Sequence, residues 1–135
     1  MKKLLAIVVL GLMWPSVVFS NSLIGKKLEC NFSDVMWQYF EFISEDKVQK
    51  WLYTGTAKAI KFSPYYYDTS VGFITIYPSK KKDILKKDGM LSRETLRYTE
   101  KVLTYKCRII DVNIDELLEK RFEIDSAKQR KKNKI

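Results

Sequence analysis

The sequence predicts a mainly β fold, namely a small antiparallel up-and-down β-barrel or strongly curved meander of about seven or eight strands, followed by one C-terminal α-helix. Short runs rich in aromatic and β-branched residues recur about every eight to twelve residues, with turn-forming clusters between them. A cysteine lies in the first and in the last of these runs. After residue 112 the apolar spacing changes from that of a strand to that of a helix.

The first twenty residues have the features of a secretory signal peptide. Two lysines precede an apolar run, residues 4–14, and small or polar side chains surround Ser20. We expect cleavage after Ser20, with Ser16 as a weaker second site. The alternative is an uncleaved membrane anchor, but a spanning helix needs about 20 apolar residues and Pro15 interrupts this run. The expected location is the periplasm or the extracellular space.

The remaining chain is long enough for one domain with a modest core. We therefore divide the sequence into a signal peptide (1–20), a β-barrel domain (21–112), and a C-terminal amphipathic helix with a basic tail packed on the same domain (113–135). The expected strands are Ile24–Cys30, Val35–Ile43, Val48–Thr54, Ala57–Phe62, Tyr65–Asp68, Val71–Tyr77, Thr95–Thr99 and Val102–Ile110. The lysine-rich segment Ser79–Gly89 is interpreted either as a charged hairpin or as a loop.

The two cysteines are predicted to form a structural disulfide. An oxidising compartment outside the cytosol allows such a bridge to persist. Strand alternation places Cys30 on one face with Leu28, and Cys107 on one face with Tyr105, so both thiols are expected to point inward. A bridge between the first and last strands would close the sheet and stabilise the fold by about 4 to 5 kcal/mol. The alternative, a redox-active or metal-binding pair, lacks a C-x-x-C motif and any histidine.

A helix is expected from Ile114 to about Lys128, because Ile114, Leu117, Leu118 and Phe122 recur at helical spacing and form an apolar stripe. Asn113 is the predicted N-cap, with Glu116 three residues later. The formal net charge is +9, and residues 126–135 carry five lysines or arginines and no acid. This basic end is interpreted as a solvated tail or, through residues 128–134, as a peripheral contact with an anionic membrane.

Aromatic residues are concentrated in the middle of the chain. Thirteen of the sixteen that follow the predicted signal lie between Phe32 and Tyr77. The strand around Trp37 is apolar on both faces, so it is covered on both sides or lines a binding site. The alternative is that the aromatics fill a small core. The candidate ligand-binding residues are Trp37, Tyr39, Trp51, Tyr53, Tyr65, Tyr66 and Tyr67.

The sequence predicts no enzyme. Without histidine there is no Ser-His-Asp triad, no Cys-His pair and no usual zinc site, and the five glycines form no phosphate-binding loop. No catalytic residue, metal or cofactor is therefore assigned, and export argues against a nucleic-acid partner. We expect a non-enzymatic binding module that contacts a small apolar or extended ligand, or an envelope protein. The alternative is a structural protein of the cell envelope whose basic helix touches a membrane or an anionic polymer.

Several segments carry a resemblance. They are the lysine-led leader, LIGKKLEC directly after it, LSRETLRY, YKC in the last strand and the ending KNKI. In this layout the chain resembles small exported proteins of marine bacteria with AT-rich genomes, which implies export and the same fold but no activity. More remotely, a barrel tied from first strand to last is similar to lipocalin-like carriers and periplasmic lysozyme inhibitors. Gly25-Lys26-Lys27 stands where lipocalins have G-x-W, and no segment matches an inhibitor loop of the lysozyme inhibitors residue by residue, so neither activity carries over.

Overall fold

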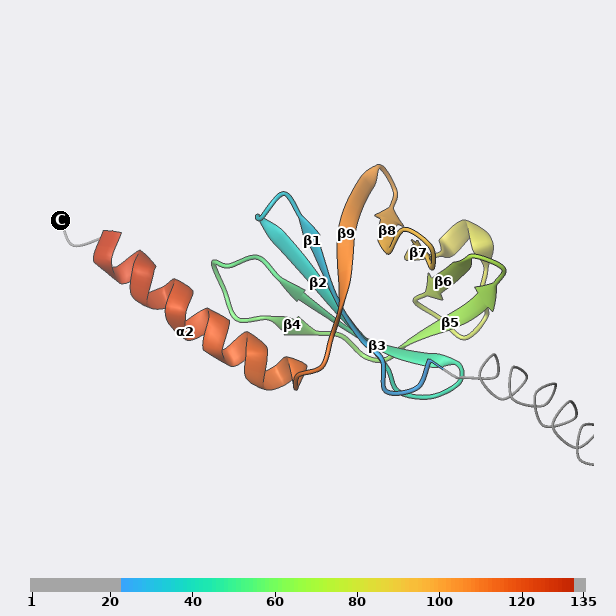
Figure 1. The fold of residues 1–135 in the computed structure, drawn as a ribbon, viewed down its shortest axis with the longest axis horizontal. Helices are drawn as coiled ribbons and strands as arrows, with labels where there is room; N and C mark the ends of the chain where they lie inside the picture. The colour runs from blue at the N-terminus through green and yellow to red at the C-terminus, as the bar shows by residue number, and fades with distance from the viewer. Residues whose placement is uncertain (1–22, 133–135) are drawn as a thin grey trace, which may run out of the picture.

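The structure, a computed structural model, describes residues 23–132 and consists of a β-barrel with one long helix on its outside (Figure 1). The predicted signal peptide lies outside the described residues. The elements are β1 (Lys27–Phe32), β2 (Met36–Phe42), β3 (Lys47–Tyr53), β4 (Ile60–Lys61), β5 (Tyr65–Ser70), β6 (Phe73–Tyr77), the 3-10 turn η1 (Ile84–Lys86), β7 (Gly89–Ser92), β8 (Arg97–Glu100), β9 (Leu103–Ile110) and α2 (Ile114–Lys132).

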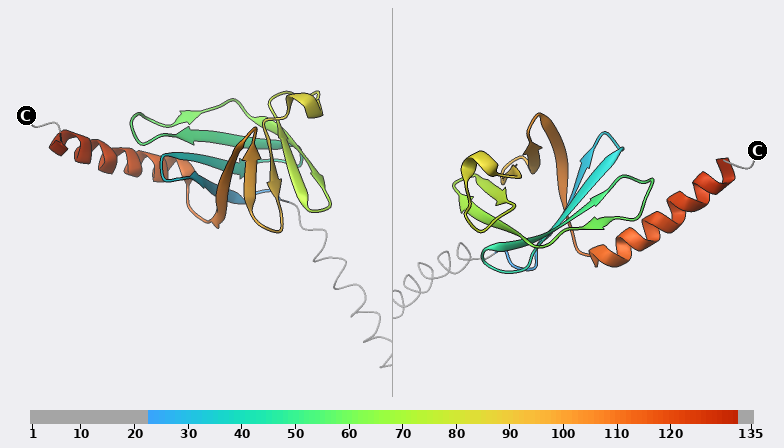
Figure 2. Two further views of the ribbon diagram at one scale, coloured as in Figure 1. Left: turned by 90° about the horizontal axis from the view of Figure 1, so that it is seen from above. Right: turned by 180° about the vertical axis from the view of Figure 1, so that it is seen from behind.

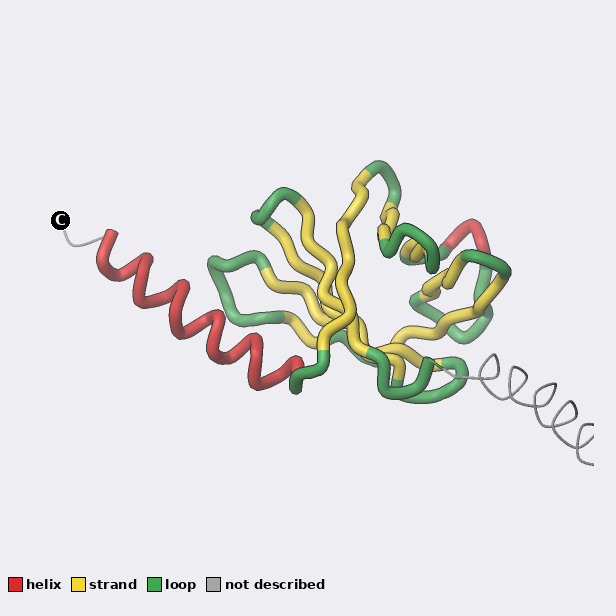
Figure 3. The backbone as a smooth tube through the Cα atoms, in the orientation of Figure 1, coloured by secondary structure: helices red, strands yellow, loops and turns green. Residues whose placement is uncertain are grey.

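Eight strands close the antiparallel barrel. Each strand pairs with its neighbour in the chain, β3 passes directly to β5, and β9 returns to pair with β1. The short strand β4 pairs with the second half of β3, beside β5. The connections therefore alternate between the two ends of the barrel, as the tube in Figure 3 shows. The predicted fold class is confirmed.

The disulfide joins the first and last strands from inside the barrel. The β1–β9 register places Cys30 directly opposite Cys107, and the two sulfurs are bonded. Cys30 is fully buried, and Cys107 packs against the same core. The predicted pairing is confirmed. A buried disulfide is compatible with an oxidising environment.

Side chains fill the barrel interior. Inward-facing residues of all eight strands form one cluster in which every buried member is 5% exposed or less. Its buried members are Leu28, Cys30, Phe40, Phe42, Val48, Tyr67, Ile74, Ile76, Leu91, Tyr98 and Tyr105. An interior of this kind is typical of a small eight-stranded barrel. It leaves little room for the central ligand that a lipocalin-like carrier would hold.

The interior also contains an ion pair between Lys50 and Asp88. Lys50 Nζ lies 3.0 and 2.9 Å from the two carboxylate oxygens of Asp88. The Tyr98 hydroxyl donates a hydrogen bond to the same carboxylate. Burial, with the nearby charge of Asp88, raises the pKa of Tyr98 above its usual value, so this hydroxyl remains a donor. The cluster fastens the loop that precedes β7 to the inside of β3.

Three elements differ from the sequence prediction. The strand β7 was not predicted, and the expected strand Ala57–Phe62 is reduced to the two residues of β4. For the segment Ser79–Gly89 the sequence allowed a charged hairpin or a loop, and the structure shows a loop containing η1 that leads into β7. The helix continues to Lys132, four residues beyond the expected end, because its last turns contain mainly strong helix formers and no glycine or proline.

Candidate functional site

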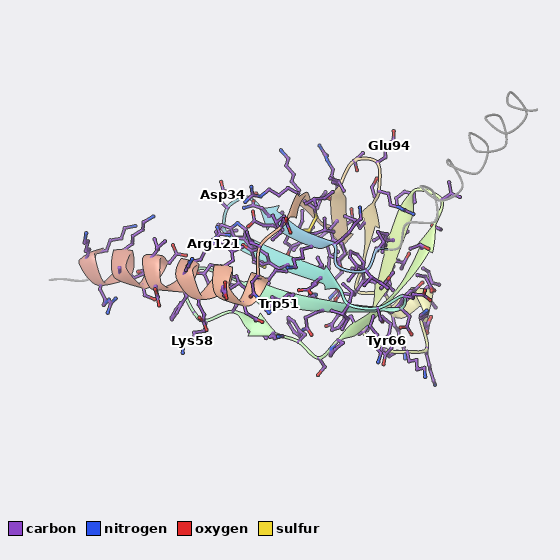
Figure 4. The ribbon with its side chains drawn as sticks, turned by 60° about the horizontal axis from the view of Figure 1, so that its bottom comes forward. Asp34, Trp51, Lys58, Tyr66, Glu94 and Arg121 are labelled. Atoms are coloured by element: carbon purple, nitrogen blue, oxygen red, sulfur yellow. A yellow bond between two sulfur atoms is a disulfide. The ribbon has the colours of Figure 1, made fainter. Side chains whose placement is uncertain are left out.

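Four of the predicted aromatics gather on the outer face of β2 and β3. The register places Trp37 opposite Tyr53 and Tyr39 opposite Trp51, with all four side chains pointing out of the barrel. The helix α2 packs over them, so β2 is covered by the core on one side and by the helix on the other. Figure 4 shows Trp51 and Arg121 between the strands and α2.

A carboxylate on β1 ties this face to the helix. The Tyr39 hydroxyl donates to Glu29 Oε2 at 2.9 Å, and Arg121 of α2 donates to the Tyr39 hydroxyl and to Glu29 at 3.4 Å. Arg108 of β9 donates to Glu29 Oε1 at 2.8 Å. Burial raises the pKa of Tyr39, and the hydrogen bond to Glu29 raises it further. The Glu29 carboxylate thus joins β1 to β2, β9 and α2, and Arg121 is its contact with the helix.

A second contact holds the middle of α2. The Tyr53 hydroxyl donates to Asp125 Oδ2 at 2.5 Å, and burial followed by this hydrogen bond raises the pKa of Tyr53 to about 12. The guanidinium of Arg121 lies 4.5 Å from the centre of the Trp37 ring. Gly55 has a φ of +80°, and a Cβ atom placed on it would lie 3.8 Å from Asp125 Oδ2. The loop after β3 thus runs close against the helix.

Trp51 is held at the first turn of α2. Its indole Nε1 donates to Asp115 Oδ1 at 3.0 Å, and Lys61 donates to Asp115 Oδ2 at 3.2 Å. The Lys61 ammonium also lies 5.3 Å from the centre of the Trp51 ring. These contacts connect β3, β4 and α2, and they leave the indole only 3% exposed.

Beside Trp51, an open groove of about 640 Å³ runs between β4 and α2. One wall is the segment that leads into β4, and the other is a face of the helix with residues three and four apart. The lining residues are Trp51, Lys58, Ala59, Lys61, Asp115, Leu118, Glu119, Phe122 and Glu123. We call this feature the outer groove. Its volume lies within the range of ligand sites.

The two walls of the outer groove carry opposite charges. Lys58 and Lys61 belong to the strand side, whereas Asp115, Glu119 and Glu123 belong to the helix side. Asp115 is already engaged by Lys61, while Glu119 and Glu123 are exposed. The groove therefore combines an apolar base with a helix wall that attracts cations.

The other three candidate aromatics lie elsewhere. Tyr67 is buried in the barrel core, and Tyr65 packs against that core, with the ammonium of Lys50 5.2 Å from its ring centre. Tyr66 is partly exposed beside the start of β3, away from the helix (Figure 4). Trp37, Tyr39, Trp51 and Tyr53 are thus brought together, and the triple tyrosine is not part of their cluster.

A smaller hollow of about 170 Å³ lies at the barrel end where β1 begins. Apolar residues and two cations, Lys26 and Arg93, line it. Core side chains such as Phe42 form its floor and close it toward the interior. The outer groove offers more room and a longer contact surface.

Several groove residues were not predicted from the sequence. The stripe of Leu118 and Phe122 follows helical spacing and was recognised as apolar, but its strand partner was unknown. Lys58 and Ala59 lie in a segment that was predicted to be a strand. A pattern of local residues could not indicate that this segment faces a helix more than fifty residues later.

No protein-family model, curated protein or solved structure matches this chain. Within residues 23–132, no three side chains suited to a metal ion lie together. No helix in the same range is long and apolar enough to cross a membrane.

Proposed function

We propose that this protein is an exported, non-enzymatic binding module that holds an extended segment of another protein in the outer groove. The observation that carries this proposal is the position of the groove between a strand edge and a helix. Among the described strands, β4 pairs only with β3, so its other edge faces outward with Ile60 and Lys61 exposed. An extended peptide can add to such an edge through its backbone.

The lining of the groove supports a peptide of defined chemistry. An apolar side chain of the peptide would lie against Leu118 and Phe122, where burial contributes about 25 cal/mol per Å². A neighbouring lysine or arginine of the peptide would approach Glu119 and Glu123 on the helix wall. The filled interior favours this outer surface over a ligand inside the barrel.

A groove-filling substitution tests the proposal. Peptides selected by the purified protein from a random displayed library should bind the Ala59→Trp variant about tenfold or more weakly, a loss of roughly 1.4 kcal/mol. Ala127→Trp places the same side chain on the exposed helix beyond the groove and should leave the affinity unchanged. Fluorescence anisotropy measures both. Equal affinity for Ala59→Trp, with its folding verified by thermal unfolding, would place the peptide elsewhere.

The second candidate is an envelope protein whose basic helix rests on a membrane or an anionic polymer. One observation favours it. The end of α2 extends past the strands (Figure 2), and its cations Lys128, Arg130, Lys131 and Lys132 are exposed. Co-sedimentation with anionic vesicles, with and without residues 126–135, tests this candidate, which requires binding that depends on the tail.

A further inference from the structure

The loop between β6 and β7 combines exposed aliphatic side chains with lysines. Its turn η1 presents Leu85, 91% exposed, and Ile84, 52% exposed. Five lysines flank them on both sides, at positions 80, 81, 82, 86 and 87. Singly exposed apolar residues are common on protein surfaces, but an apolar tip surrounded by cations is typical of a surface that enters a lipid interface.

The loop is held in place by contacts on both sides of its tip. Lys82 donates to Asp68 at 2.7 Å, and Asp83 accepts a hydrogen bond from the Leu85 amide at 3.0 Å. At its end, Asp88 is paired with Lys50 in the barrel interior. These contacts use the acidic side chains of the loop internally. Four exposed lysines, at positions 80, 81, 86 and 87, therefore surround the tip, where they outnumber the one exposed acid of the loop, Asp83.

The neighbouring β8–β9 turn adds a second exposed apolar side chain and a lysine to this surface. The β8–β9 turn lies at the same end of the barrel, because β6–β7 and β8–β9 are alternate connections of one antiparallel meander. It presents Val102, 93% exposed, next to Lys101. A second apolar tip with a cation thus accompanies the first.

We propose that this end of the barrel docks on an anionic lipid bilayer through loop 79–88, with Leu85 and Ile84 entering the interface and the lysines contacting the headgroups. The lysines match a negative surface, and each contributes about fivefold in affinity near such a surface. The exposed aliphatic tip favours a bilayer over a soluble anionic polymer, because a polymer offers no apolar layer to receive it. This surface is distinct from the outer groove and from the tail of α2.

An environment-sensitive fluorophore on the loop tests the insertion. The full chain carries Leu85→Cys or, as a matched control, Val71→Cys, whose fully exposed position lies on the β5–β6 turn at the opposite end. We expect the label at 85 to shift to shorter wavelength with vesicles of phosphatidylcholine and phosphatidylglycerol. The shift should be absent with phosphatidylcholine alone and at position 71. No shift at 85, or an equal shift at both positions, would overturn the proposal.

Charge variants identify the partner. Replacing Lys80, Lys81, Lys86 and Lys87 with glutamine should weaken binding to the phosphatidylglycerol vesicles at least about tenfold. The matched control replaces four exposed lysines of α2, at positions 120, 128, 131 and 132, and should have the smaller effect. A larger loss in the helix variant would assign binding to the tail. Loop-dependent binding to heparin without a shift at 85 would assign an anionic polymer. Either result overturns the proposal.

Discussion

The side chain of Tyr53 helps to hold α2 on the barrel. Its hydroxyl donates to Asp125, and burial raises its pKa to about 12, so it stays neutral over the whole physiological pH range. The neutral form is the one that can donate to the carboxylate. The same face holds Tyr39 by a similar contact with Glu29. The phenol of Tyr53 therefore fastens α2 directly to the barrel, whereas Tyr39 and Glu29 are joined to α2 through Arg121.

Replacing Tyr53 with phenylalanine should reduce the free energy of unfolding by about 1 kcal/mol at neutral pH. In the unfolded chain a tyrosine loses its proton near pH 10, whereas folded Tyr53 keeps it to about 12. Between these values the unfolded state binds fewer protons, so the contribution of Tyr53 is complete below pH 10 and is lost as the pH rises to about 12. Urea unfolding as a function of pH measures it.

The stability difference between the natural protein and Tyr53→Phe should therefore narrow above about pH 10. Tyr66→Phe, on a partly exposed tyrosine away from the helix, is the control and should change stability little. A difference that stays constant or widens above pH 10 would contradict this interpretation of Tyr53.

Among the elements, α2 has the largest consequence for the outer groove, because it supplies one complete wall. Its start is set by Asn113, whose side-chain oxygen accepts from the Glu116 amide at 3.0 Å. The sequence predicted this cap. It also predicted the apolar stripe that meets the strands.

Replacing Asn113 with alanine should destabilise the protein by about 1 kcal/mol, because the first turn of the helix loses a capping acceptor. Asn113→Asp keeps an acceptor and should cost little. Chemical denaturation followed by far-ultraviolet circular dichroism measures both. Equal losses for the two variants would show that the cap does not contribute through its acceptor.

The elements that the sequence did not predict have identifiable physical reasons. The strand β7 begins at Gly89, which disfavours a strand assignment. In the barrel this glycine allows close approach, since a side chain there would begin 2.4 Å from the Tyr98 ring. The strand β4 has only two residues, too few for an alternating pattern. The cysteines and the strong alternation around Cys107 made the first and last strands predictable.

The candidate site was also predictable only in part. The strand around Trp37, with apolar residues on both faces, indicated an outer covering or a binding site, and Trp37, Tyr39, Trp51 and Tyr53 do meet α2. The run Tyr65-Tyr66-Tyr67 did not by itself indicate which side chain points into the barrel, because that depends on how β5 is placed in the sheet. The outer groove is formed by segments that are far apart in the chain, and local sequence patterns do not indicate which distant segments pack together.

At the scale of the whole molecule, the disulfide and the closed sheet act together. Removing the bridge by Cys30→Ser with Cys107→Ser should lower the free energy of unfolding by about 4 kcal/mol, since the unfolded chain regains the freedom of a long loop. Denaturant unfolding of the two proteins measures the loss. Alkylation of two thiols in the native, unreduced protein would contradict the bridge.

The filled barrel interior favours a binding site on the outer surface. The interior is occupied by core side chains and one ion pair, whereas the outer groove remains open between β4 and α2. The most direct test is nuclear magnetic resonance of the indole N–H of Trp51, which donates to Asp115 beside the groove. On addition of a selected peptide we predict a shift of this signal and of the Ala59 and Lys61 amides. A peptide that binds while these signals stay unchanged, and that instead shifts residues such as Leu96 at the small hollow, would contradict the proposed function.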